Sequence, residues 1–172
     1  MGYFKFGLKL LGSHALMTAV QSFLFLLLFG IFESEWYQWI AGIFFIALFW
    51  FIIYADASHY GQNDLKRGTF RYSKGFLSGL VASVPALILY VLSLSFSSFD
   101  LFRVTLRIWL IPYIKLMVAF ENYMPAITIV FILLFPLVTG FSYIDGIRRR
   151  NKIMEKIREK ESMRAELSKR NQ

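Results

Sequence analysis

Four long apolar runs dominate this chain of 172 residues and restrict its fold more than any other feature. They cover residues 15–32, 36–54, 76–96 and 124–144. A helix needs about 20 mostly apolar residues to cross the hydrocarbon core of a bilayer. None of the four runs carries Asp, Glu, Lys or Arg in its middle. The runs therefore predict an all-α membrane protein with four transmembrane helices.

The composition indicates that lipid is the main solvent of the folded chain. Hydrophobic residues make up 57% of the sequence, and 19 residues are Phe. Soluble domains are nearer about 45–50% apolar, and a chain of this size has too little core to bury the excess. The sequence has no Cys, which excludes disulfides, iron–sulfur clusters and Cys-ligated zinc.

The first apolar run has two interpretations, an uncleaved span or a signal peptide. It follows a short amphipathic segment, residues 1–14. The run is longer than the apolar part of a signal peptide, and no small-residue cleavage site precedes Glu33. We therefore expect residues 15–32 to stay in the protein as its first span.

The distribution of charge predicts the topology. If all four runs cross the membrane, residues 1–14, 55–75 and 148–172 share one side. All but three of the 19 Lys and Arg residues lie there, so the positive-inside rule makes that side cytoplasmic. We predict a plasma-membrane protein with both termini in the cytoplasm, a transmembrane domain over 1–147 and a charged, helical cytoplasmic tail. The same asymmetry explains the net charge of +8 without nucleic acid as a partner.

Residues 97–124 hold the three remaining cations, which are Arg103, Arg107 and Lys115. On one helix they would fall within about a third of the circumference. A fifth span over 99–120 would bury Arg107 near its middle, at a cost of ~2.5–3.5 kcal/mol, and would move the cationic tail outside. We therefore expect an extracytoplasmic interfacial or re-entrant helix. Its cations would contact lipid phosphate or, alternatively, a bound anionic ligand such as a lipid-linked phosphate.

A stripe of small residues marks the third span. Gly75 and Gly79 form a GxxxG pair that Ser83 continues, and Ala82 and Ala86 belong to a second row beside it. Small residues on one stripe let a neighbouring helix approach closely in lipid. We expect packing inside the monomer, with a homo-oligomer or a membrane-protein partner as the alternative.

The polar stretch at residues 55–75 holds the best candidates for chemistry. Asp56, His59 and Asp64 are weak candidates for an acid–base pair. With one histidine present we predict no metal site and no cofactor, and hydrogen bonds within the stretch are the simpler expectation. Several cations are expected to contact anionic lipid headgroups, namely Lys66, Arg67 and Lys74. Asp145, at the end of the fourth run, is expected to pair with Arg67 or Lys74.

Several motifs together resemble a known family. They are GQNDLKRGTFRYSKGFLSG at 61–79, Pro85, Leu101-Phe102-Arg103, and FPLVTGFSYIDG at 135–146. The pattern resembles small, uncharacterised multi-pass membrane proteins of low-GC Gram-positive bacteria, which have a Gly-, Asp- and Asn-containing loop between spans two and three. The resemblance implies architecture only, because that family has no assigned activity.

The sequence contains no nucleophile elbow, HExxH motif or phosphate-cradling Gly loop. This favours a non-enzymatic accessory or structural subunit of a membrane complex that serves transport or envelope assembly. Two alternatives remain. One is a lipid-processing enzyme or flippase-like factor, and the other is a small oligomeric transporter or pore.

Overall fold

The computed structural model describes residues 2–31, 34–96 and 100–170, which are helical apart from short turns. The long helices are α1 (Tyr3–Ile31), α2 (Glu35–Lys66), α3 (Lys74–Ser95) and α6 (Met124–Arg170). Between α3 and α6 lie the short helices α4 (Asp100–Trp109) and α5 (Ile114–Ala119), with the 3₁₀ turns η1 (Ile111–Tyr113) and η2 (Glu121–Tyr123). Four helical segments are long and apolar enough to cross a membrane, which agrees with the prediction of four spans.

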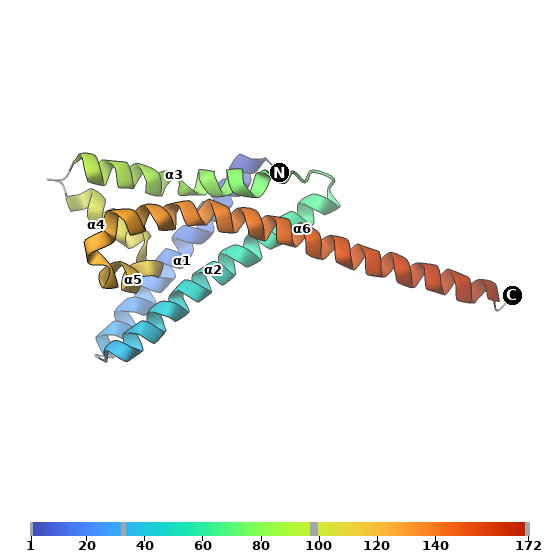
Figure 1. Ribbon diagram of the computed structural model, residues 1–172, viewed down its shortest axis with the longest axis horizontal. Coiled ribbons are helices and arrows are strands. Elements are labelled where there is room, and N and C mark those ends of the chain that lie inside the picture. The colour runs from blue at the N-terminus through green and yellow to red at the C-terminus, as the bar shows by residue number, and fades with distance from the viewer. Residues whose placement is uncertain (1, 32–33, 97–99, 171–172) are drawn as a thin grey trace.

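The long helices form two pairs that meet at one end of the bundle and diverge at the other (Figure 1). α3 packs along α6, and α1 runs beside α2. The pairs meet near the N-terminus and the α2–α3 turn, where α2 also crosses α6 (Figure 1). α4 and α5 occupy the diverging end, and the last part of α6 projects beyond the bundle (Figure 1).

Glycines allow the close approach where the pairs meet. At Gly146 of α6, an added Cβ would lie 2.7 Å from the carbonyl carbon of Ser58 on α2. At Gly75 of α3, it would lie 2.6 Å from Cβ of Tyr143 and 3.0 Å from Cα of Gly140. Real side-chain contacts do not reach such distances, so only glycine fits where α6 passes between α2 and α3.

The small-residue stripe of the third span packs inside the chain. All five predicted members are buried, namely Gly75, Gly79, Ala82, Ser83 and Ala86. The Ser83 hydroxyl donates to the carbonyl of Gly79 at 3.0 Å and lies 3.4 Å from the carbonyl of Ile132 on α6. The opposite side of α3 exposes large apolar side chains, among them Leu80, Val84 and Ile88. The stripe therefore serves contact with α6, and the apolar side suits lipid.

The diverging end is filled by the segment from α4 to η2. Its inner face buries large side chains, namely Leu106, Leu110, Tyr113 and Met117. The segment is not one continuous helix as the spacing of its cations predicted, because α4 ends at Trp109 and a 3₁₀ turn containing Pro112 follows. Proline lacks the backbone N–H and clashes with the preceding turn, so it breaks a helix at this position.

The long helices extend beyond the predicted spans. α1 begins at Tyr3 and therefore includes the N-terminal segment expected to lie outside the first span. α2 continues to Lys66, so the predicted 55–75 loop is reduced to residues 67–73. α6 joins the fourth span to the tail without a break. Residues 32, 171 and 172, which belong to the predicted first span and tail, lie outside the described residues.

Candidate functional site

The three weak catalytic candidates on α2 do not form one site. Asp56 accepts a hydrogen bond from the Ser13 hydroxyl of α1 at 2.7 Å. The Asn63 amide donates to Nε2 of His59 at 2.7 Å, on an exposed surface. Asp64 is buried toward α3 and α6. Continuation of α2 separates these side chains around the helix, so the structure gives them three different environments.

The buried carboxylate belongs to a group that we call the Asp64 cluster, made of Asp64, Thr69, Lys74 and Tyr143. Nζ of Lys74 lies 2.5 Å from Oδ2 of Asp64, and the Tyr143 hydroxyl donates to the same oxygen at 2.9 Å. The Thr69 hydroxyl donates to Oδ1 at 3.2 Å. The side chains of Asp64 and Lys74 are only 3% and 7% exposed. The cluster therefore joins α2, α3 and α6 through one fully partnered carboxylate.

This geometry corrects two expectations about Lys74 and Asp145. Lys74 was expected to contact lipid headgroups or Asp145, but its ammonium is buried against Asp64. Asp145 instead accepts from Nε of Arg149, one turn along α6, at 2.8 Å, and from the Tyr54 hydroxyl of α2. Both differences arise because α2 extends to Lys66 and brings Asp64, rather than Asp145, to the first turn of α3.

The cations of the α2–α3 turn lie near those of α6. Lys66 and Arg67 are exposed at the end of α2. A groove of about 410 Å³ lies between this end and α6, lined by Leu65, Lys66, Arg150, Asn151, Met154, Glu155 and Arg158. An exposed, mostly basic surface of this kind suits anionic headgroups. The expectation for Lys66 and Arg67 therefore stays a prediction.

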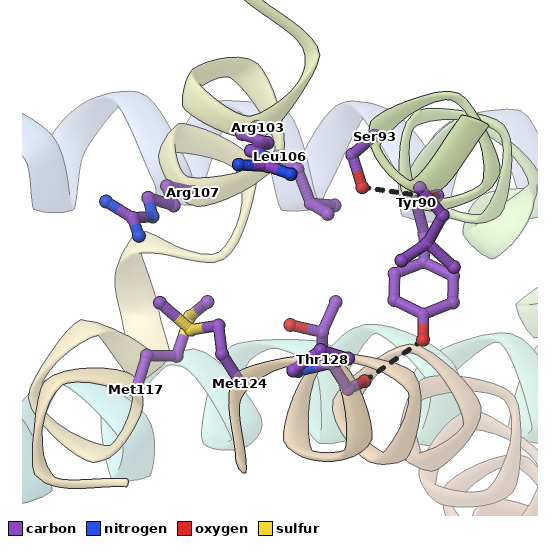
Figure 2. Close-up of a pocket in the computed structure, with 10 residues that line it drawn as sticks. Tyr90, Ser93, Arg103, Leu106, Arg107, Met117, Met124 and Thr128 are labelled. Carbon is purple, nitrogen blue, oxygen red and sulfur yellow. Dashed lines mark hydrogen bonds between the residues drawn. The ribbon is translucent and has the colours of Figure 1, made fainter. Parts of the chain in front are cut away.

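The candidate binding site is a cavity of about 250 Å³ at the diverging end of the bundle, which we call the α4 pocket. It is lined by Tyr90, Ser93, Leu94, Arg103, Leu106, Arg107, Met117, Met124, Pro125 and Thr128. Figure 2 shows α4 on one side of the cavity, α3 at its end and α6 opposite α4. The Tyr90 hydroxyl donates to the Pro125 carbonyl at 3.2 Å, and the Ser93 hydroxyl donates to the Tyr90 carbonyl at 2.7 Å. The first bond joins α3 to α6 at the end of the pocket, and the second lies within α3.

Two of the three cations in residues 97–124 that were predicted to bind anions line the α4 pocket. Arg103 and Arg107 are four residues apart on α4, so they lie on one side of that helix. Lys115 lies elsewhere, because α4 has ended before it. Its Nζ donates to Oε1 of Gln38 on α2 at 3.2 Å and lies 5.3 Å from the ring centre of Trp39. The two arginines therefore lie on one side of a helix as predicted, whereas Lys115 does not lie with them.

His14, which was not among the predicted site residues, binds the carbonyl at the end of α4. It is 6% exposed, and its Nε2–H donates to the Trp109 carbonyl at 3.2 Å. The Thr18 hydroxyl lies 3.5 Å from the same carbonyl. Where a helix ends inside an apolar region, its free carbonyls need such donors. The spacing of Phe6, Leu10 and His14, each four residues from the next, was the available signal that His14 faces inward.

Thr128 is the second residue that sequence reasoning missed. It lies on α6, is 3% exposed, and Figure 2 shows its hydroxyl directed into the α4 pocket. Within the described residues, no group of three or more His, Asp or Glu side chains is arranged to hold a metal ion. Comparison of the chain with known protein families, curated proteins and solved structures gives no match.

Proposed function

We propose that this chain is a non-enzymatic accessory or structural subunit of a membrane complex that serves transport or envelope assembly. The observation that carries the proposal is the α6 stalk, residues 148–170. The stalk continues a membrane-compatible helix without a break and projects beyond the bundle (Figure 1). At a rise of 1.5 Å per residue it is about 34 Å long. A rigid extension of this kind suits attachment to another protein.

The proposed setting is a bacterial plasma membrane with both termini in the cytoplasm. The cation-rich α6 stalk, the α2–α3 turn and the N-terminus all belong to one side in a four-span arrangement. The positive-inside rule makes that side cytoplasmic. The segment from α4 to η2 is then a re-entrant element on the extracytoplasmic side, supported by its broken helices and its buried inner face.

The α6 stalk has an apolar face that nothing covers within the described residues. Ile153, Ile157, Met163 and Leu167 are 45%, 42%, 57% and 59% exposed. At 100° per residue they occupy about a third of the helical circumference. Cations outnumber carboxylates along the stalk. These features fit a helix that binds in an acidic, apolar groove of a second protein.

A substitution on the apolar face tests this proposal. We expect Ile157→Lys to reduce photocrosslinking from position 153 to a partner about tenfold or more, because burial of an Ile side chain contributes ~1.5–3 kcal/mol. The measurement is the yield of a discrete adduct in native membranes. Ser162→Lys, which adds the same charge on the opposite face, should leave the yield unchanged.

Two results would contradict the accessory role. One is an adduct that persists at full yield in the Ile157→Lys chain. The other is an adduct that contains only a second copy of this chain, because the α6 stalk would then serve self-association.

A further inference from the structure

The α4 pocket combines an apolar interior with a cationic side. Its walls include Leu94, Leu106, Met117, Met124 and Pro125. A smaller cavity of about 100 Å³ adjoins it and shares Arg107, Met117 and Met124 as lining residues. A small soluble anion would gain nothing from contact with the apolar walls, and a purely apolar molecule would leave the arginines without a counter-charge. The combination suits an amphiphile with a negatively charged head.

The two arginines are available for that head. Neither Arg103 nor Arg107 forms an ion pair with a residue in the described part of the chain. Both are exposed, and both line the cavity from α4. A guanidinium presents several N–H donors in a planar fork that matches phosphate oxygens. Two of them one helical turn apart fit a single phosphate group.

Thr128 gives an independent indication of a ligand. Other helical hydroxyls in this protein donate to the carbonyl four residues earlier, as Ser22, Thr105 and Ser142 do at 2.6, 2.8 and 2.6 Å. The Thr128 hydroxyl has no such bond among the described residues, although the side chain is 97% buried (3% exposed). An unpaired hydroxyl at the wall of a largely apolar cavity is available to a polar group that enters the cavity. Its direction into the cavity in Figure 2 means that a bound polar group would supply the missing bond.

We propose that the α4 pocket binds a phosphate ester carried on an apolar chain, with Arg103 and Arg107 on the phosphate and Thr128 bonded to an oxygen of the same head. The cavity of about 250 Å³ holds only part of such a molecule. The rest of the chain would extend into the bilayer. A membrane phospholipid and an isoprenoid phosphate share this chemistry. The proposal goes beyond the accessory role and does not depend on the α6 stalk.

Native mass spectrometry of the full chain, released from detergent, tests the proposal. The probes are phosphatidylglycerol, an isoprenoid monophosphate, and zwitterionic phosphatidylcholine as the charge control. We expect one tightly retained anionic lipid per chain and at least tenfold weaker retention of phosphatidylcholine. Tighter binding of phosphatidylglycerol or of the isoprenoid phosphate identifies which source supplies the head. Equal retention of all three lipids would overturn the proposal.

Substitutions test whether the lipid binds in the α4 pocket. We expect Arg103→Gln/Arg107→Gln to weaken retention of the anionic lipid at least tenfold, and Thr128→Val, which keeps the shape of the side chain, to weaken it several-fold. Lys160→Gln/Arg164→Gln removes the same charge from two exposed residues four positions apart on the α6 stalk and should retain the lipid as the unaltered chain does. Unchanged retention in the Arg103/Arg107 variant or in Thr128→Val, or an equal loss in the Lys160/Arg164 variant, would overturn the assignment.

Discussion

Replacing Asp64 with Ala is expected to lower the free energy of unfolding by ~3–5 kcal/mol, the range measured when one partner of a buried ion pair is removed. The Lys74 ammonium would stay 2.5 Å from where the carboxylate had been, in a site that leaves its side chain 7% exposed. The Tyr143 and Thr69 hydroxyls would lose their acceptor as well. The measurement is reversible unfolding of the purified chain in mixed micelles.

Two controls separate the buried charge from a general loss of contact. Asp145→Ala removes a carboxylate that is 40% exposed, and it should cost under about 1 kcal/mol, as exposed ion pairs do. Asp64→Leu combined with Lys74→Met removes both charges and should recover most of the lost stability. If Asp64→Ala lowered the free energy of unfolding no more than Asp145→Ala does, the buried ion pair would not be a main source of stability.

Replacing Gly146 with Val is expected to disrupt the contact between α2 and α6. The first added carbon would lie 2.7 Å and 2.8 Å from backbone atoms of Ser58, and a backbone moves less readily than the end of a side chain. Overpacking a tight core costs about 1–3 kcal/mol, and displacing α6 would also strain the Asp64 cluster. We expect a loss at the upper end of that range or above it, measured by the same unfolding experiment.

Gly12→Val is the matched control, because an added Cβ at Gly12 meets nothing within 4 Å. Gly is a poor helix former relative to most residues, so this variant should be neutral or slightly stabilising. Equal losses at Gly12 and Gly146 would mean that backbone propensity, rather than close helix contact, determines the effect.

The parts of the fold that were predictable depend on local sequence. Hydropathy identified four spans because each must match the thickness of a bilayer, and the structure has four suitable helices. The small-residue stripe around Gly75 and Gly79 was visible because its spacing follows the helical period. The ends of the helices were harder to predict from the sequence. For example, α2 continues through polar residues beyond its apolar run, as far as Lys66.

The parts that were not predictable depend on how helices cross. Lys74 pairs with Asp64 only because α2, α3 and α6 converge at glycines, and no spacing in the sequence encodes that meeting. Lys115 does not lie beside Arg103 and Arg107 because the helix ends before Pro112. The spacing of the three cations gives no sign of that break. His14 lies in the amphipathic N-terminal segment and Thr128 in an apolar run. Neither stands out in the sequence, because their roles depend on the end of α4 lying beside His14 and the α4 pocket forming beside Thr128.

Cysteine labelling tests the membrane topology directly, because the chain has no Cys. Single cysteines can be placed at four exposed positions, namely Ser34, Ser73, Asn122 and Ser162. With a membrane-impermeant maleimide, we expect Ser34→Cys and Asn122→Cys to react in intact cells. Ser73→Cys and Ser162→Cys should react only after the membrane is permeabilised. Two results would contradict four crossings with a cytoplasmic α6 stalk. One is labelling of Ser162→Cys in intact cells. The other is labelling of Asn122→Cys only after permeabilisation, as expected for Ser73→Cys.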